Sequence, residues 1–327
     1  MSQQVTDTSS QPRLDALHPH LETTLVTATE AAALAAARLI GRGDQERTKA
    51  AAAQAMLESL DQLIEVPARI VLTPGGDAIL SPGSVVGRGG EPQLDLAVYP
   101  AESAGLVARG LPNAVSIVVA TVPDGFPTLP SVAYVEKIAV GPPARGGVDL
   151  DDTLADNLRR VAFARDCRIN DLVVAVLDRP RHQDLVEEIR SVGARVLVLE
   201  DGDVAAAMSP SVDGSGVDAM LGIGGVQEGI MGACAMRCLG GDLQLRLWPR
   251  NDEELILAGG EAGRVYKVGD LSPNDAVMAV SGISGGVLLE QVRYRAGWAE
   301  TDSLVMSSRW GTVRRLTTRH LRQLEAS

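Results

Sequence analysis

Polar side chains follow directly after a buried strand predicted at residues 94–98. This apolar run is typical of a strand that is buried on both faces, and Pro100 breaks it. Ligands of α/β proteins bind outside the carboxyl ends of such strands. We therefore expect Tyr99, Glu102 and Ser103 to face a pocket. There the carboxyl group could take part in proton transfer or metal binding, and the phenol could donate a hydrogen bond.

A second polar cluster follows two strands of the later chain. Arg179 and Arg181 come after the strand predicted at 171–177, and two guanidinium groups on a proline corner suit bidentate recognition of a phosphate. Asp201 and Asp203 follow the next strand, where Asp201 could accept hydrogen bonds from sugar hydroxyls. The alternatives are a solvated helix start for the arginines and a helix cap for Asp203.

A glycine-rich loop follows the third strand of the same region. Gly222, Gly224 and Gly225 precede the helix predicted at 226–239, and the free N–H groups at a helix N-terminus attract anions. The loop lacks the dinucleotide fingerprint, because its last glycine would fall at Gln227, and an ordinary turn is the alternative. Three successive strands thus place polar residues at one sheet edge, which favours a site for a polyol phosphate.

The elements that must position these clusters change character at residue 151. The later segment alternates helices and strands and predicts a βαβαβ unit with a parallel sheet. Its strands are expected at 171–177, 194–199 and 218–222, and its helices at 183–192 and 204–208. The other expected elements are helices at 22–40, 49–63 and 226–239, a helix that starts at 151, and strands at 69–72, 94–98, 114–122, 135–140, 276–280, 287–294, 303–307 and 313–319.

The composition narrows the class of protein. A formal net charge of −12 argues against nucleic acid or an anionic membrane as a partner, since both need a basic face. The three cysteines and four histidines lack metal-ligand spacing, so neither a disulfide framework nor a histidine-based zinc site is expected. No stretch resembles a signal peptide or reaches the roughly 18 apolar residues of a membrane span. We therefore expect a soluble, cytoplasmic protein.

A series of motifs occurs in one order: GRGD at 41–44, DLAV at 95–98, YVEK at 134–137, LADNLR at 154–159, PRH at 180–182, DGDVAA at 201–206, GIGG at 222–225 with EG at 228–229, and VRR at 313–315. Together these motifs resemble the class II fructose-1,6-bisphosphatase family, the bacterial type, which also includes sedoheptulose-1,7-bisphosphatases. The resemblance implies a layered α/β/α/β/α sandwich. The sequence itself predicts a flexible tail at 1–20, an α+β domain at 21–150 and an α/β domain at 151–327. The resemblance implies metal-site positions in the first domain and sugar-phosphate contacts in the second.

The resemblance also implies functional residues. Asp44, Glu102 and Glu228 match positions whose carboxylates ligate Mn²⁺ or Mg²⁺ in the family. Together with Tyr99, they are the candidate catalytic residues. Asp44 has the alternative role of an N-cap. The implied contacts to a phosphorylated sugar are Tyr134, Arg179, Arg181, Asp201, Asp203 and Gly225. A homo-oligomer is implied by the resemblance alone.

Two ligand positions of the family are lost in this chain. Pro74 stands at a glutamate position of the family's Gly-Glu-Gly-Glu motif. Tyr99 stands at the aspartate position of the family's Asp-Pro-x-Glu-Gly-Thr motif, so each of these two residues replaces a carboxylate. Ala104 replaces the Thr that handles the attacking water. Three carboxylates and a phosphate could only partly surround two divalent cations, so we expect at most one cation site.

Two functions remain open from the sequence. The first is an enzyme that acts on a phosphorylated sugar with altered or weakened chemistry, in which Tyr99 fills the vacated space or serves as an acid. The second is a catalytically inactive paralogue that binds a sugar phosphate as a sensor or scaffold. Both are consistent with the predicted phosphate-binding edge of the sheet.

Overall fold

Helices and strands alternate in the middle of the chain, from residue 154 to residue 282. The computed structural model describes residues 14–321. Its helices are α1 Leu14–Ala37, α2 Gln45–Leu63, α3 Ala104–Arg109, α4 Leu154–Ala164, α5 Gln183–Val192, α6 Asp203–Met208, α7 Val226–Leu239, α8 Asp252–Ala258 and α9 Val268–Leu271. Its strands are β1 Ala68–Leu72, β2 Val85–Val86, β3 Leu94–Glu102, β4 Val115–Thr121, β5 Tyr134–Val140, β6 Val173–Leu177, β7 Arg195–Leu199, β8 Ala219–Gly225, β9 Asp242–Leu247, β10 Val265–Lys267, β11 Ala276–Gly282, β12 Arg293–Arg295, β13 Trp298–Ser307 and β14 Thr312–Leu321.

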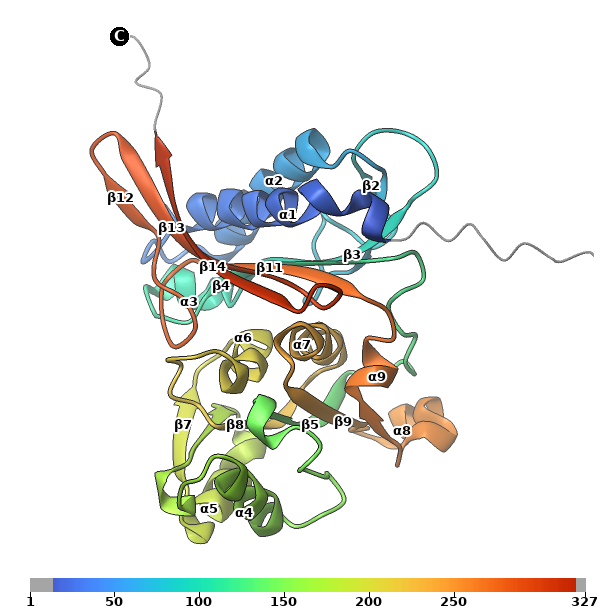
Figure 1. Ribbon diagram of the computed structural model, residues 1–327, viewed down its shortest axis with the longest axis vertical. Coiled ribbons are helices and arrows are strands. Elements are labelled where there is room, and N and C mark those ends of the chain that lie inside the picture. The colour runs from blue at the N-terminus through green and yellow to red at the C-terminus, as the bar shows by residue number, and fades with distance from the viewer. Residues whose placement is uncertain (1–13, 322–327) are drawn as a thin grey trace, which may run out of the picture.

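These elements stack in five layers (Figure 1). Helices α1 and α2 cover one face of an eight-stranded sheet, and α6 and α7 separate this sheet from a six-stranded one. Helices α4 and α5 cover the far face of the second sheet. The α/β/α/β/α sandwich expected from the sequence is therefore confirmed. Within residues 14–321, no helix combines the length and apolar character needed to cross a bilayer.

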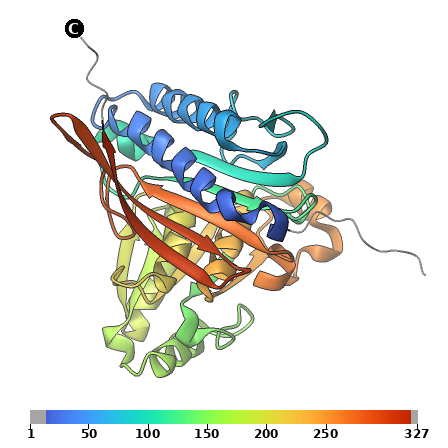
Figure 2. The same ribbon diagram turned by 45° about the horizontal axis from the view of Figure 1, so that its top comes forward.

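The first two helices pack through small side chains. Ala28, Ala32 and Ala36 of α1 are fully buried and recur every four residues, so they share the helix face that meets the sheet. Figure 2 shows α1 and α2 side by side across that sheet. Helix α1 already begins at Leu14, so the tail predicted at 1–20 overlaps the helix, while residues 1–13 lie outside the described part of the chain.

The eight-stranded sheet combines strands from both ends of the chain. Its order is β12-β13-β11-β4-β3-β1-β2, and β14 pairs with β13. Every residue of β4 is buried, and in β3 only Tyr99 is partly exposed. This burial follows from the helices on both faces of the sheet, and it explains the unbroken apolar runs in the sequence.

The six-stranded sheet has the order β10-β9-β5-β8-β6-β7. Strand β6 pairs in parallel with β7 and β8, as the predicted βαβαβ unit requires. Strand β5 pairs antiparallel with β8 and β9, and β10 pairs antiparallel with β9, so the sheet is mixed. The carboxyl ends of β6, β7 and β8 nevertheless meet at one edge.

Two sequence expectations differ from the structure. The domain boundary predicted near residue 150 does not separate the two sheets. Strand β5 precedes this boundary but belongs to the second sheet, and β11–β14 follow it but belong to the first sheet. The strand predicted at 287–294 is wrong: only a bridge between Ser284 and Gln291 and the short β12 occur there. Leu288 and Leu289 are buried from a loop, and burial rather than pairing explains their apolar character.

Candidate active site

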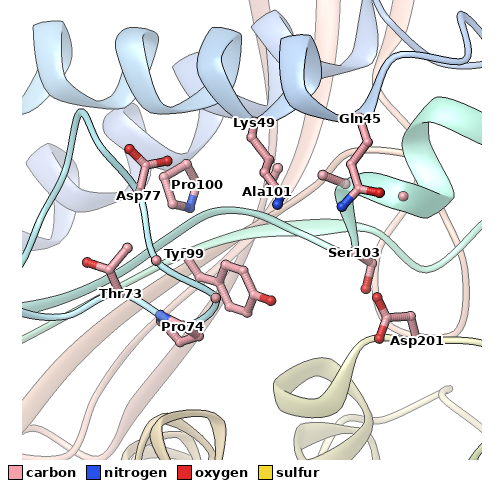
Figure 3. Close-up of a pocket in the computed structure, with 14 residues that line it drawn as sticks. Gln45, Lys49, Thr73, Pro74, Asp77, Tyr99, Pro100, Ala101, Ser103 and Asp201 are labelled. Atoms are coloured by element: carbon pink, nitrogen blue, oxygen red, sulfur yellow. The ribbon is translucent and has the colours of Figure 1, made fainter. Parts of the chain in front are cut away.

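A cavity lies at the end of β3, beneath the start of α2 and beside the loop that follows β1. It has a volume of about 200 Å³, and its lining includes Lys49, Tyr99, Ser103, Asp201 and the loop at 73–77. Figure 3 shows Lys49 reaching from α2 toward the cavity and the Tyr99 hydroxyl directed to the side of Ser103 and Asp201. We call this cavity the β3 pocket. Tyr99 and Ser103 line this pocket, as the sequence predicts, whereas Glu102, which was expected to face it as well, does not.

The backbone turns sharply at the end of β3. The pairing of β3 with β4 shifts register between Tyr99 and Glu102, where Pro100 provides no N–H donor for the ladder. Ser103 then adopts a left-handed conformation with φ of 66°. This conformation is uncommon for a residue that carries a side chain, and such local strain clusters at functional sites. The strained turn brings Ser103 to the wall of the β3 pocket.

Tyr99 carries a neutral phenol. Burial raises the pKa of its hydroxyl far above the ordinary value, and the neighbouring carboxyl groups of Glu102 and Glu228 raise it further. Loss of the proton would place a second anion in apolar surroundings beside those acids. The hydroxyl can therefore donate a hydrogen bond to a bound ligand at neutral pH.

Glu102 connects the two halves of the sandwich and does not line the β3 pocket. It is 2% exposed, and its two oxygens accept hydrogen bonds from the backbone N–H groups of Val204 (2.7 Å) and Ala205 (3.1 Å). Burial raises the pKa of Glu102 to about 8, although the two N–H groups act in the opposite direction. Both oxygens are thus engaged in holding the first turn of α6.

Glu228 folds back onto the glycine-rich loop from the first turn of α7. Burial also raises the pKa of this carboxyl group. One of its oxygens lies 1.9 Å from the position that a Cβ at residue 225 would take, so a side chain there would displace the Glu228 carboxyl group. Gly225 pairs with Tyr134 across β8 and β5. The predicted residues Glu228, Gly225 and Tyr134 are therefore brought together.

His182 fixes the end of β8. Its Nε2 accepts a hydrogen bond from the backbone N–H of Ile223, and its Nδ1–H donates to the carbonyl of Leu177, both at 2.7 Å. Burial lowers the pKa of the imidazole, which agrees with the neutral form that these two bonds require. The ring thereby positions the loop that precedes α7.

Asp44 lies apart from the other predicted metal ligands. It is exposed, it caps α2 by accepting a hydrogen bond from the N–H of Arg47 (2.9 Å), and it does not line the β3 pocket. Glu102 already accepts two backbone hydrogen bonds. Among residues 14–321, no three His, Cys, Asp or Glu side chains are grouped so that they could hold a metal ion. The donor set therefore does not fit a divalent cation.

Four of the predicted sugar-phosphate contacts form two pairs of contacting residues at the edge of the second sheet. The guanidinium of Arg181 lies 4.7 Å from the centre of the Tyr134 ring, and Arg179 forms an ion pair of 2.7 Å with Asp201. Asp201 also lines the β3 pocket, so this edge and the pocket adjoin each other. We call Tyr134, Arg179, Arg181 and Asp201 the phosphate edge.

Asp203 has a structural partner that the sequence did not reveal. The ammonium of Lys137 donates to its Oδ2 at 2.5 Å, and Lys137 is 1% exposed. The other oxygen of Asp203 is buried without a hydrogen-bond partner in the described part of the chain. A Cβ at Gly224 would lie 1.9 Å from the paired oxygen, which explains the glycine. Asp203 is therefore half-satisfied beside the site.

The sequence reasoning missed two residues of the β3 pocket. Gln45 and Lys49 lie one helical turn apart on α2, so both side chains project from the same face onto the end of β3. The available signal was this four-residue spacing, together with a lysine in a helix whose neighbours are mostly alanine. Nothing in the local pattern indicated that this face covers a pocket.

Comparisons with known proteins identify one family across most of the chain. The family model for bacterial fructose-1,6-bisphosphatase, glpX-encoded, matches residues 19–320. The D-fructose 1,6-bisphosphatase class 2/sedoheptulose 1,7-bisphosphatase of Synechococcus elongatus is 36% identical over 331 residues, which covers 91% of this chain and 95% of the relative. Fructose-1,6-bisphosphatase 1 class 2 of Escherichia coli is 36% identical over 312 residues, covering 89% and 92%.

Proposed function

The chain belongs to the bacterial, glpX-encoded fructose-1,6-bisphosphatase family, and on this premise we propose that it binds a phosphorylated sugar and hydrolyses the phosphate ester with altered or weakened chemistry. The names of its relatives point to fructose 1,6-bisphosphate and sedoheptulose 1,7-bisphosphate as the first ligands to test. The proposed site extends from the β3 pocket along the phosphate edge.

The observation that carries this proposal is the state of Arg181. Its Nε and Nη2 groups donate to the carbonyl of Ile223, which fixes the guanidinium over the ring of Tyr134. Within residues 14–321, its Nη1 group donates to no protein atom. A positioned guanidinium with a remaining N–H is suited to a phosphate oxygen, because such charge-assisted hydrogen bonds are strong.

The size of the β3 pocket supports a divided site. Its volume of about 200 Å³ is below the roughly 300–1,000 Å³ of clefts that hold a whole small-molecule ligand. A phosphate group would fill much of this space, and the remaining sugar would lie along the phosphate edge. Asp201 lies at the junction, where its carboxylate could accept hydrogen bonds from sugar hydroxyls.

Weakened hydrolysis follows from the acids that remain. Both oxygens of Glu102 cap α6, Asp44 caps α2, and Tyr99 keeps its proton. The carboxylates that line the β3 pocket are Asp77 and Asp201, and Oδ1 of each already has a partner, so among the described residues only their second oxygens remain for an attacking water. The engaged state of these acids equally favours the second candidate, an inactive sugar-phosphate-binding protein.

The test is a phosphate-release assay run beside calorimetric binding. Fructose 1,6-bisphosphate and sedoheptulose 1,7-bisphosphate are assayed with Mn²⁺ or Mg²⁺, and the Escherichia coli relative serves as the reference. We expect binding with turnover about 100-fold or more below the reference, as loss of acid–base groups typically costs. Residual turnover that disappears in Glu228→Gln supports an enzyme, whereas binding without turnover supports the inactive paralogue.

A matched pair of arginine variants tests the location of the site. Arg181→Met removes the guanidinium over Tyr134, and we expect about tenfold weaker binding, as for the loss of one charge-assisted hydrogen bond. Arg319→Met removes an equivalent guanidinium, 4.3 Å from the ring of Trp298 in the first sheet, and should bind normally. Equal affinity in both variants would contradict a site at the phosphate edge.

We further propose that the protein acts in the cytoplasm and assembles as a homo-oligomer. Cys167 is exposed and all three cysteines are free, which is typical of a reducing compartment. The oligomer rests on the family resemblance. Size-exclusion chromatography with light scattering checks it directly.

A further inference from the structure

Within the described part of the chain, the β3 pocket is lined by one positively charged side chain, that of Lys49. We propose that this pocket binds the phosphate of its sugar ligand without a divalent cation, with the Lys49 ammonium supplying the positive charge. The inference rests on the proposed function, because it concerns how the same ligand is held. It goes further by replacing the expected cation with a side chain of this protein.

Lys49 is available to a ligand. Its ammonium lies 3.2 Å from Glu46 on the same helix, and the side chain of Glu46 is 82% exposed. An ion pair with such a solvated partner contributes little, so an incoming phosphate can replace it at small cost. Figure 3 shows the lysine extending from α2 toward the end of β3, with Gln45 beside it.

The acids around the pocket already have partners. Asp201 forms an ion pair with Arg179 at 2.7 Å. Oδ1 of Asp77 accepts hydrogen bonds from the N–H groups of Ile79 and Leu80, which closes its own turn. Neither carboxylate forms an ion pair with Lys49, so within the described structure the ammonium pairs only with the solvated Glu46.

Two hydroxyl groups complete the anion site. Ser103 is 4% exposed, and its Oγ has no hydrogen-bond partner among the described residues. It is held in the strained left-handed conformation, and its hydroxyl is directed toward Asp201, on the side to which the Tyr99 hydroxyl points (Figure 3). An ammonium and two hydroxyls are all donors to phosphate oxygens, and lysine serves as a point charge in such sites. A buried hydroxyl without a partner is costly unless a ligand provides one.

The experiment compares binding with and without metal. Fructose 1,6-bisphosphate is titrated calorimetrically into the full chain, once in EDTA and once in Mn²⁺, and Mn²⁺ alone is titrated as a separate arm. We expect similar affinity in both buffers and no saturable binding of Mn²⁺ alone. Lys49→Met should weaken the binding in EDTA by about tenfold or more, the loss expected for one charged hydrogen bond.

The matched control is Lys267→Met. Lys267 is one of only three lysines in the chain, and it is exposed on β10 in the second sheet. This variant removes the same charge and should bind as the parent protein does. Circular dichroism melts of both variants establish that they are folded.

The possible results separate the inference from the proposed function. Binding that requires Mn²⁺, or that is unchanged in Lys49→Met, overturns the inference and leaves the sugar-phosphate site intact. Absence of binding in both buffers overturns the proposed function and the inference with it. Metal-independent binding that Lys49→Met alone weakens supports both.

Discussion

The buried polar layer beneath α1 and the region of Ser103 and Asp203 at the β3 pocket contain buried polar side chains in opposite states of pairing. The layer consists of Thr29, Glu30, Ser281, Thr301 and Ser303. Ser281 forms hydrogen bonds of 2.8 Å to both Thr29 and Ser303, and one oxygen of Glu30 accepts from Thr301 (3.0 Å) and Ser303 (3.2 Å). These contacts join the first helix to β11 and β13. All of these buried groups have partners, so the layer contributes to the fold.

Two buried residues are incompletely paired: Ser103, which lines the β3 pocket, and Asp203, which does not line it. Oγ of Ser103 and Oδ1 of Asp203 are buried and have no hydrogen-bond partner among residues 14–321. Each such group costs about 1–3 kcal/mol in the folded state, and few are retained in native proteins. The contrast teaches that pairing, rather than burial of polar atoms, separates the groups that hold this fold from those poised for a ligand.

Lys137→Met should have the largest effect, because it would extend the incomplete pairing to both oxygens of Asp203. The ion pair is almost fully buried, and removal of one partner leaves an uncompensated carboxylate. We expect the free energy of unfolding to fall by about 3–5 kcal/mol, measured by urea denaturation. Lys267→Met, an exposed lysine, should change it by less than about 0.5 kcal/mol. A loss below about 1 kcal/mol for Lys137→Met would mean that Asp203 is hydrated.

Glu30→Leu tests the paired side of the comparison. It removes the acceptor of Thr301 and Ser303 and should cost about 1–3 kcal/mol of unfolding free energy. Glu30→Gln keeps an acceptor oxygen and should lose less. Affinity for fructose 1,6-bisphosphate should be unchanged in both variants, as measured by calorimetry. Weaker ligand binding in Glu30→Leu would blur the distinction between the two regions.

Ser103→Gly should have the smallest effect and the opposite sign. Glycine adopts φ of 66° without strain, and the unpaired hydroxyl is removed. We expect a gain of about 1 kcal/mol in unfolding free energy, reduced in part by the greater freedom of glycine in the unfolded chain. Binding of fructose 1,6-bisphosphate should weaken severalfold. Greater stability with undiminished affinity would show that the hydroxyl does not contact the ligand.

The sequence was informative where a pattern is local. The apolar run at 94–98 predicted β3, and the alternation after residue 151 predicted the parallel strands β6, β7 and β8. Hydrophobic periodicity does not specify the partner of a strand, so the return of β11–β14 to the first sheet could not be predicted. The helix at 226–239 was predicted in full, whereas the short β10 and α9 left no recognisable pattern.

The same division holds for the candidate site. Arg179, Arg181 and Asp201 follow strand ends and could be predicted to share an edge. Lys49 could not be predicted as a residue of the site. It lines the pocket because α2 lies over the end of β3, where Tyr99 is 50 residues further along the chain, and a local sequence pattern does not specify such a long-range contact. For Asp44 the opposite holds. Its motif suggested a metal ligand, but in the structure its carboxylate caps the start of α2.

The first sheet combines strands from early and late parts of the chain, which affects how the protein folds during its synthesis. Strand β4 pairs on one side with β3 and on the other with β11, which emerges from the ribosome some 150 residues later. Until then, the nascent chain carries a mostly apolar strand with an open edge, a state that is prone to aggregation. The first sheet therefore cannot be completed until β11 to β14 have been synthesised, and the intervening layers form beside an unfinished sheet.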